Sequence, residues 1–82
     1  MKNKTDELYY TTSDLALVAA LVTWDFSIES IDKSDHKKVL FVFKETLPLK
    51  DHIQFYWNDT KLLSPKRYFS ILKEVKSRIY QG

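Results

Sequence analysis

The 82-residue chain contains no cysteine, one glycine and two prolines. Without cysteine there is no disulfide framework and no thiolate metal site, and small secreted domains usually need such a link. We therefore expect a cytoplasmic protein. Because the one glycine is Gly82, the loops must be built without glycine's freedom to adopt positive φ.

Long hydrophobic runs are also missing. The longest, Leu15 to Val22, covers eight residues, whereas crossing a bilayer takes about 20. The first residues, Met1 to Glu7, are polar and lack the apolar core of a signal peptide. We predict a flexible N-terminal tail over residues 1–8 and no association with membranes.

The composition favours one packed domain. Hydrophobic residues make up 44% of the chain and aromatic residues 15%, which is more than a disordered segment carries. A chain of this length has room for a single core. We expect residues 9–82 to form one compact domain.

The apolar run predicts the first helix, over residues 15–24. It follows Thr11 to Asp14, a cluster of residues that commonly cap helices. Because the run is apolar on every side, the helix should be covered on more than one side and lie near the middle of the domain.

Two strands are predicted next. Phe26 and Ile28 alternate with polar residues, and Val39–Phe43 is β-branched and aromatic. The polar connection over residues 32–37 predicts an antiparallel hairpin with a longer loop. Since the second strand is apolar on both faces, each face needs a cover or another strand lies beside it. Tyr9–Tyr10 could supply that third strand.

The remaining elements are two helices, over residues 47–58 and 65–80. Ser64 is the predicted N-cap of the last helix, Pro65 its first residue, and Leu63 should pack on Tyr68. Its expected core face consists of Tyr68, Ile71, Leu72, Val75 and Ile79. The sequence therefore predicts a small α+β domain with an antiparallel hairpin, or a three-stranded sheet, and three helices in the order (β)-α-β-β-α-α.

The charges divide unevenly between the two halves. Residues 1–45 carry six basic and eight acidic side chains, a net of −2, whereas residues 46–82 carry seven basic and three acidic ones, a net of +4. The positive half is compatible with a nucleic-acid backbone or an acidic protein surface as partner.

One flank of the last helix combines rings and positive charge. Phe69 and Tyr80 fall outside the core face, near three lysines: Lys66, Lys73 and Lys76. Bases stack on aromatic rings while lysines meet phosphates, so this flank is a candidate nucleic-acid site. In the alternative interpretation, the two rings widen the core face and the lysines form a solvated rim.

The second helix is the candidate for protein contact. Phe55, Tyr56 and Trp57 are consecutive, and a helix cannot bury three consecutive rings on one face. We expect Phe55, near His52, to be the exposed ring and an anchor for a protein partner. The alternative is that Phe55 contacts the first or the last helix.

Nothing in the sequence points to catalysis. His36 and His52 have no second histidine at a metal-binding spacing, and there is no phosphate loop or nucleophile motif. We expect no enzyme activity, no metal, no cofactor and no small-molecule substrate. Phe41 and Phe43 share one face of a strand but lack the glycines and basic residues of RNA-recognition sheets, and we expect them in the core.

A resemblance rests on three stretches of the chain. They are Tyr10–Ala16, Ile31–Asp32 with Lys38–Phe43, and Ser64–Phe69 with Arg78–Tyr80. Together they resemble a family of short bacterial and phage open reading frames that form a domain of unknown function. The resemblance spans residues 9–80. It implies a small free-standing, non-enzymatic domain and brings no catalytic residue with it.

Two functional hypotheses follow. The first is a nucleic-acid-binding accessory protein that uses the flank of the last helix. The second is a protein-interaction module, such as a phage-encoded inhibitor or a small subunit of a larger complex.

Overall fold

The structure is a computed structural model, and it describes residues 8–80. The elements follow one another as β1 (Tyr9–Thr12), α1 (Leu15–Thr23), β2 (Ser30–Asp35), β3 (Lys38–Lys44), α2 (Leu47–Asn58) and α3 (Pro65–Tyr80). This order, β-α-β-β-α-α, is the predicted one with the additional first strand. Except for Leu8, the tail expected over residues 1–8 lies outside the described residues.

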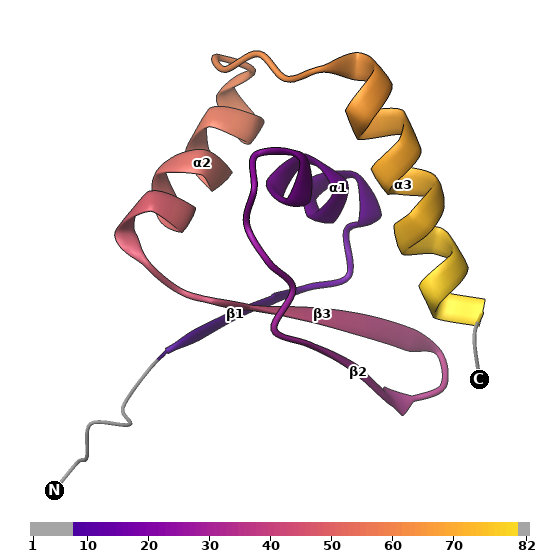
Figure 1. The fold of residues 1–82 in the computed structure, drawn as a ribbon. Coiled ribbons are helices and arrows are strands. Elements are labelled where there is room, and N and C mark those ends of the chain that lie inside the picture. The colour runs from indigo at the N-terminus through magenta and orange to yellow at the C-terminus, as the bar shows by residue number, and fades with distance from the viewer. Residues whose placement is uncertain (1–7, 81–82) are drawn as a thin grey trace, which may run out of the picture.

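The three strands form one antiparallel sheet in the order β1-β3-β2, so β3 has a neighbour on each side. All three helices lie on the same side of this sheet (Figure 1). Phe41 and Phe43 of β3 are fully buried beneath them, as predicted. Leu40 and Val42 point to the opposite face and are half-buried, because no described helix covers that face.

The boundaries of β2 differ from the prediction. Phe26 and Ile28 do not belong to a strand but pack against the core from the segment that joins α1 to β2. Their alternation therefore reflects burial and not strand pairing. The predicted long loop is instead mostly strand, and the two-residue turn between Asp35 and Lys38 is closed by a 2.9 Å bond from the backbone N–H of Lys37 to Asp35 Oδ1.

The polar sequence of β2 is tolerated because this strand lies at an edge of the sheet, where its side chains reach water. Asp32 accepts hydrogen bonds from the backbone N–H and the hydroxyl of Ser34, at 2.9 and 2.7 Å. These bonds lower the pKa of Asp32 below its usual value.

Helix α1 is the centre of the domain, as its composition predicted. Asp14 caps it, since its carboxylate accepts from the backbone N–H groups of Ala16 and Leu17 at 3.1 and 3.3 Å. Within the helix, Leu17 to Leu21 are at most 1% exposed. The hydroxyl of the buried Thr23 donates to the carbonyl of Ala19 at 2.6 Å. The middle of this helix is therefore covered on every side.

Helices α2 and α3 have the predicted boundaries. Thr46 caps α2 through a 3.2 Å bond from the backbone N–H of Leu49, and α2 ends at Asn58, followed by the C-cap Asp59, whose φ is 56°. Ser64 accepts from the backbone N–H of Arg67 at 3.2 Å, which confirms it as the cap of α3. Val75 is the buried contact of α3 with the core.

Replacing Leu21 by alanine tests the central position of α1. The side chain is fully buried, so that its truncation leaves a cavity and should lower the free energy of unfolding by about 2–5 kcal/mol. Denaturant titration of Leu21→Ala measures this loss. Leu62→Ala is the matched control, because Leu62 is 93% exposed. Equal stability of both variants would show that α1 is not the core helix.

Replacing Ser64 by alanine tests the cap of α3. The variant loses the acceptor for the Arg67 N–H, so its free energy of unfolding should fall by about 0.5–2 kcal/mol. Ser70→Ala makes the same chemical change at an exposed position inside α3. Thermal melts of the two variants compare them directly, and a Ser64→Ala melt that matches Ser70→Ala would exclude the capping role.

Candidate functional site

The predicted flank of α3 faces solvent. Phe69 is 59% exposed and Tyr80 is 84% exposed. All three predicted lysines, Lys66, Lys73 and Lys76, are exposed as well. The interpretation in which the two rings widen the core face is therefore wrong. We call these five residues the basic–aromatic face of α3.

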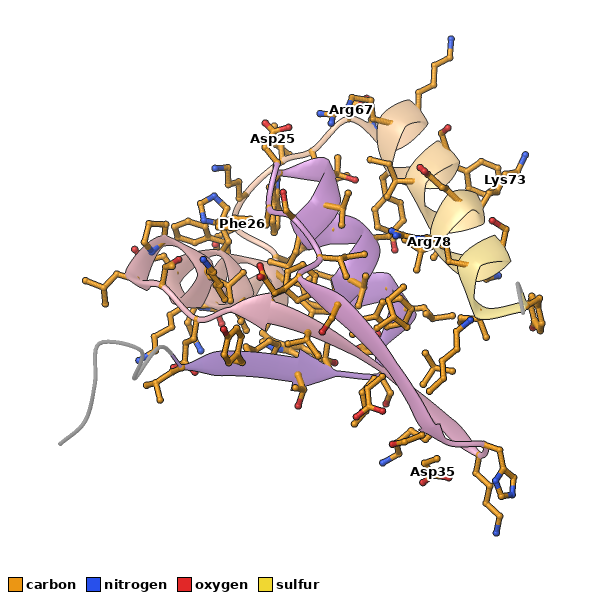
Figure 2. All side chains as sticks on the ribbon, turned by 60° about the horizontal axis from the view of Figure 1, so that its bottom comes forward. Asp25, Phe26, Asp35, Arg67, Lys73 and Arg78 are labelled. Atoms are coloured by element: carbon orange, nitrogen blue, oxygen red, sulfur yellow. The ribbon has the colours of Figure 1, made fainter. Side chains whose placement is uncertain are left out.

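The five side chains belong to one surface. At 100° per residue they fall within about 80° of one another, and the middle of this range lies roughly 140° from the buried Val75. The ammonium of Lys73 lies 5.1 Å from the centroid of the Phe69 ring, within cation–π range. Figure 2 shows Lys73 pointing away from α1. The structure thus brings together all the residues predicted for nucleic-acid binding.

The other flank of α3 is joined to the fold. The Arg67 guanidinium donates to the carbonyl of Thr23 at 2.9 Å and lies 3.5 Å from the carboxylate of Asp25, so this flank meets the C-terminal end of α1 (Figure 2). Further along, Lys33 of β2 donates to the carbonyl of Arg78 at 2.9 Å. Neither contact uses a residue of the basic–aromatic face.

The second predicted site, Phe55 and His52, lies in a cluster of rings. The His52 ring makes edge contacts with Trp24, Phe26 and Phe55, with centroid distances of 5.3, 5.0 and 5.1 Å. Its Nδ1 is 2.8 Å from the carbonyl oxygen of Pro48, which can only accept, so Nδ1 carries the proton. Nε2 then accepts from the Lys61 ammonium at 2.8 Å.

The predicted exposure of the α2 rings was wrong. Phe55 is half-buried, whereas Trp57 is 59% exposed and packs edge-on against Tyr56, with ring centroids 5.0 Å apart. The reason is the segment after α2. The left-handed turn at Asp59 brings Lys61 within 5.8 Å of the Phe55 ring centroid. Because this turn contains no glycine, the sequence gave no sign that the chain folds back over Phe55 after α2.

Sequence reasoning also missed a cavity of about 220 Å³ next to this cluster. It lies between the C-terminal halves of α1 and α2 and the first turn of α3. Its lining consists of Ala20, Trp24, Phe55, Tyr56, Asp59, Lys61, Leu63 and Tyr68. Leu63 and Tyr68, predicted to pack on one another at the start of α3, both line this cavity.

Tyr56 is the titratable group with a perturbed pKa at this cavity. Burial raises its pKa above 10.0, and the Asp14 carboxylate and Tyr68 raise it further. The neighbouring Tyr68 hydroxyl donates to the carbonyl of Ala16 at 3.5 Å. The cavity therefore favours the neutral phenol of Tyr56.

Residues 8–80 show neither a metal-binding cluster nor a membrane-spanning helix. Within them, no group of three or more His, Asp or Glu side chains is placed to hold a metal ion. His36 is exposed in the turn between β2 and β3. None of the helices described has the length and apolar character needed to span a membrane.

The raised pKa of Tyr56 predicts a loss of stability in alkali. Above about pH 10 the unfolded chain releases the phenol proton while the folded chain retains it, so the free energy of unfolding falls as pH rises toward the folded pKa. Tyr56→Phe should lose less stability over this range than the unmodified protein. The measurement is denaturant unfolding from pH 8 to about pH 11. Tyr80→Phe, at an 84% exposed ring, is the control. Parallel curves for Tyr56→Phe and the unmodified protein would contradict the effect.

Comparisons with known proteins identify the family. Neither the curated proteins nor the solved structures give a match. A family model, the domain of unknown function DUF5659, matches residues 7–81, nearly the whole chain. The predicted resemblance to a domain of unknown function is thereby confirmed, and the chain belongs to the DUF5659 family.

Proposed function

We propose that this protein is a small, non-enzymatic binding domain that holds single-stranded nucleic acid on the basic–aromatic face of α3. The observation that carries the proposal is the exposure of two rings, Phe69 at 59% and Tyr80 at 84%, on the same helix flank as three exposed lysines. Large exposed rings beside cations are the combination that sequence-tolerant single-strand binding uses.

The geometry gives this face a length suited to a strand. Phe69 and Tyr80 are separated by about 16 Å along the helix axis, which corresponds to about five nucleotides at a stacked spacing of about 3.4 Å. Lys73 and Lys76 lie between the two rings. Each base stacked on a ring contributes about 1–3 kcal/mol, and the lysines add contacts to phosphates that release counterions.

The second candidate is a protein-interaction module. It is favoured by Trp57 at 59% and Leu62 at 93% exposure, next to residues that line the 220 Å³ cavity. An aromatic anchor of a partner could enter such a cavity. His52 and Phe55 would then support the site, because they belong to the adjoining ring cluster.

Under either function we propose a cytoplasmic protein of bacterial or phage origin, on the absence of cysteine and the resemblance described above.

Fluorescence anisotropy with a labelled oligothymidylate, alone and as a duplex, tests the first function. The unmodified protein should bind the single strand at low salt. Replacing Lys73 and Lys76 with glutamine should weaken binding to all sequences equally and flatten the dependence of log K on log salt by about 0.7 for each lost contact. Tyr80→Ala should weaken single-strand binding by about 5-fold to about 140-fold, and duplex binding less.

A charge-matched control is available at the other end of the domain. Lys44→Gln with Lys50→Gln removes the same charge from β3 and α2 and should leave the salt dependence unchanged. If the unmodified protein failed to bind the single strand at low salt, the nucleic-acid function would be wrong and the protein-interaction module would take its place.

A further inference from the structure

A second hollow lies between the last turn of α3, the start of α1 and the β2–β3 hairpin. Figure 1 shows the end of α3 above this hairpin. Its volume is about 420 Å³ and it is open to solvent. The residues that line it are Ser13, Leu15, Lys37, Lys38, Val39 and Ile79. They come from the start of α1, the hairpin and the last turn of α3. We call this hollow the hairpin groove.

The groove borders α3 on the side away from Arg67, the direction in which the basic–aromatic face also lies. Arg67, on the opposite flank, reaches the C-terminal end of α1 at Thr23 and Asp25, whereas the groove is lined by Ser13 and Leu15 at the N-terminal end of that helix. The Tyr68 hydroxyl, between the two flanks, contacts Ala16. Moving around α3 away from Arg67 thus leads toward the start of α1.

The groove also continues the face along α3. Ile79 lines the groove and is half-buried, and the next residue, Tyr80, is 84% exposed. Lys76 precedes Ile79 by three positions and so lies on the adjacent helix surface. A strand stacked on Tyr80 therefore meets the groove next.

The chemistry of the groove suits a nucleic-acid strand. Lys37 and Lys38 are exposed at its wall, while Leu15, Val39 and Ile79 are half-buried and apolar. Two carboxylates lie nearby, Asp35 and Asp14. Asp35 is the sheet partner of Lys38, and its Oδ1 accepts from the backbone N–H of Lys37. Asp14, between Ser13 and Leu15, accepts from backbone N–H groups of α1. Both carboxylates are thus hydrogen-bonded to backbone N–H groups, whereas Lys37 and Lys38 are exposed at the wall, which favours a polyanion over a cationic partner.

We propose that the hairpin groove holds the continuation of the single strand bound on α3, with Lys37 and Lys38 contacting its phosphates and the apolar wall contacting a base or sugar. This inference rests on the proposed function. It makes the binding surface composite, built from the C-terminal helix and from a hairpin in the acidic half of the chain.

The test uses the double variant Lys37→Gln with Lys38→Gln and a labelled oligothymidylate long enough to extend past α3. Glutamine avoids placing a second negative charge opposite Asp35, which would weaken the hairpin. We expect the slope of log K against log salt to flatten by about 1.4 and the affinity at low salt to fall at least about fivefold. Lys44→Gln with Lys50→Gln is the charge-matched control, and a thermal melt checks that each variant is folded.

The outcomes separate this inference from the function on which it rests. If the groove variant is folded and binds with an unchanged slope while Lys73→Gln with Lys76→Gln loses affinity, the groove inference is wrong and the α3 function stands. If the groove variant and the Lys44/Lys50 control lose affinity equally, only general charge matters and the groove inference is again wrong. If the unmodified protein does not bind the oligothymidylate, the proposed function itself fails.

Discussion

The burial of α1 is the constraint on which the rest of the structure depends. Leu17 to Leu21 are at most 1% exposed, so each side of this short helix needs a cover. The sheet supplies Phe41 and Phe43, α2 supplies Leu49, and α3 supplies Val75. In a domain of this size, a large part of the hydrophobic stabilisation must come from these contacts. Each covering element uses one face for this purpose and leaves another face to solvent.

The positions of the candidate sites depend on how α2 and α3 pack against α1. Helix α3 meets the core through one face and is joined to the end of α1 through Arg67, whose guanidinium contacts Thr23 and Asp25. The rings of Phe69 and Tyr80 are exposed and do not pack in the core, and they lie on the same flank as the exposed lysines. Helix α2 differs, because its Phe55 packs against His52 and the segment after Asp59, and its Tyr56 packs against the core. This contrast is why we propose nucleic-acid binding on α3.

Elements with strong local signals could be predicted from the sequence. The bounds of both later helices were predicted correctly, and for α3 the reason is that Ser64 and Pro65 mark its start through local chemistry. The bounds of strand β2 could not be predicted, because its polar residues are stabilised by pairing with β3 and not by their own preference. Helical periodicity placed the residues of the basic–aromatic face together on one flank of α3, but only the structure shows that Phe69 and Tyr80 are exposed there. The hairpin groove did not, since Lys37 and Ile79 are far apart in the sequence and meet only in the fold.

The most direct test of a composite single-strand surface is to map where an oligothymidylate changes the amide NMR signals of the isotope-labelled protein. The account predicts that the changed signals belong to two stretches, the α3 residues from Lys66 to Tyr80 and the hairpin turn at Lys37 and Lys38. Signals around Trp57 on α2 should stay in place. Changes concentrated at Trp57, Leu62 and the cavity between α2 and α3, with α3 beyond its first turn unaffected, would contradict it.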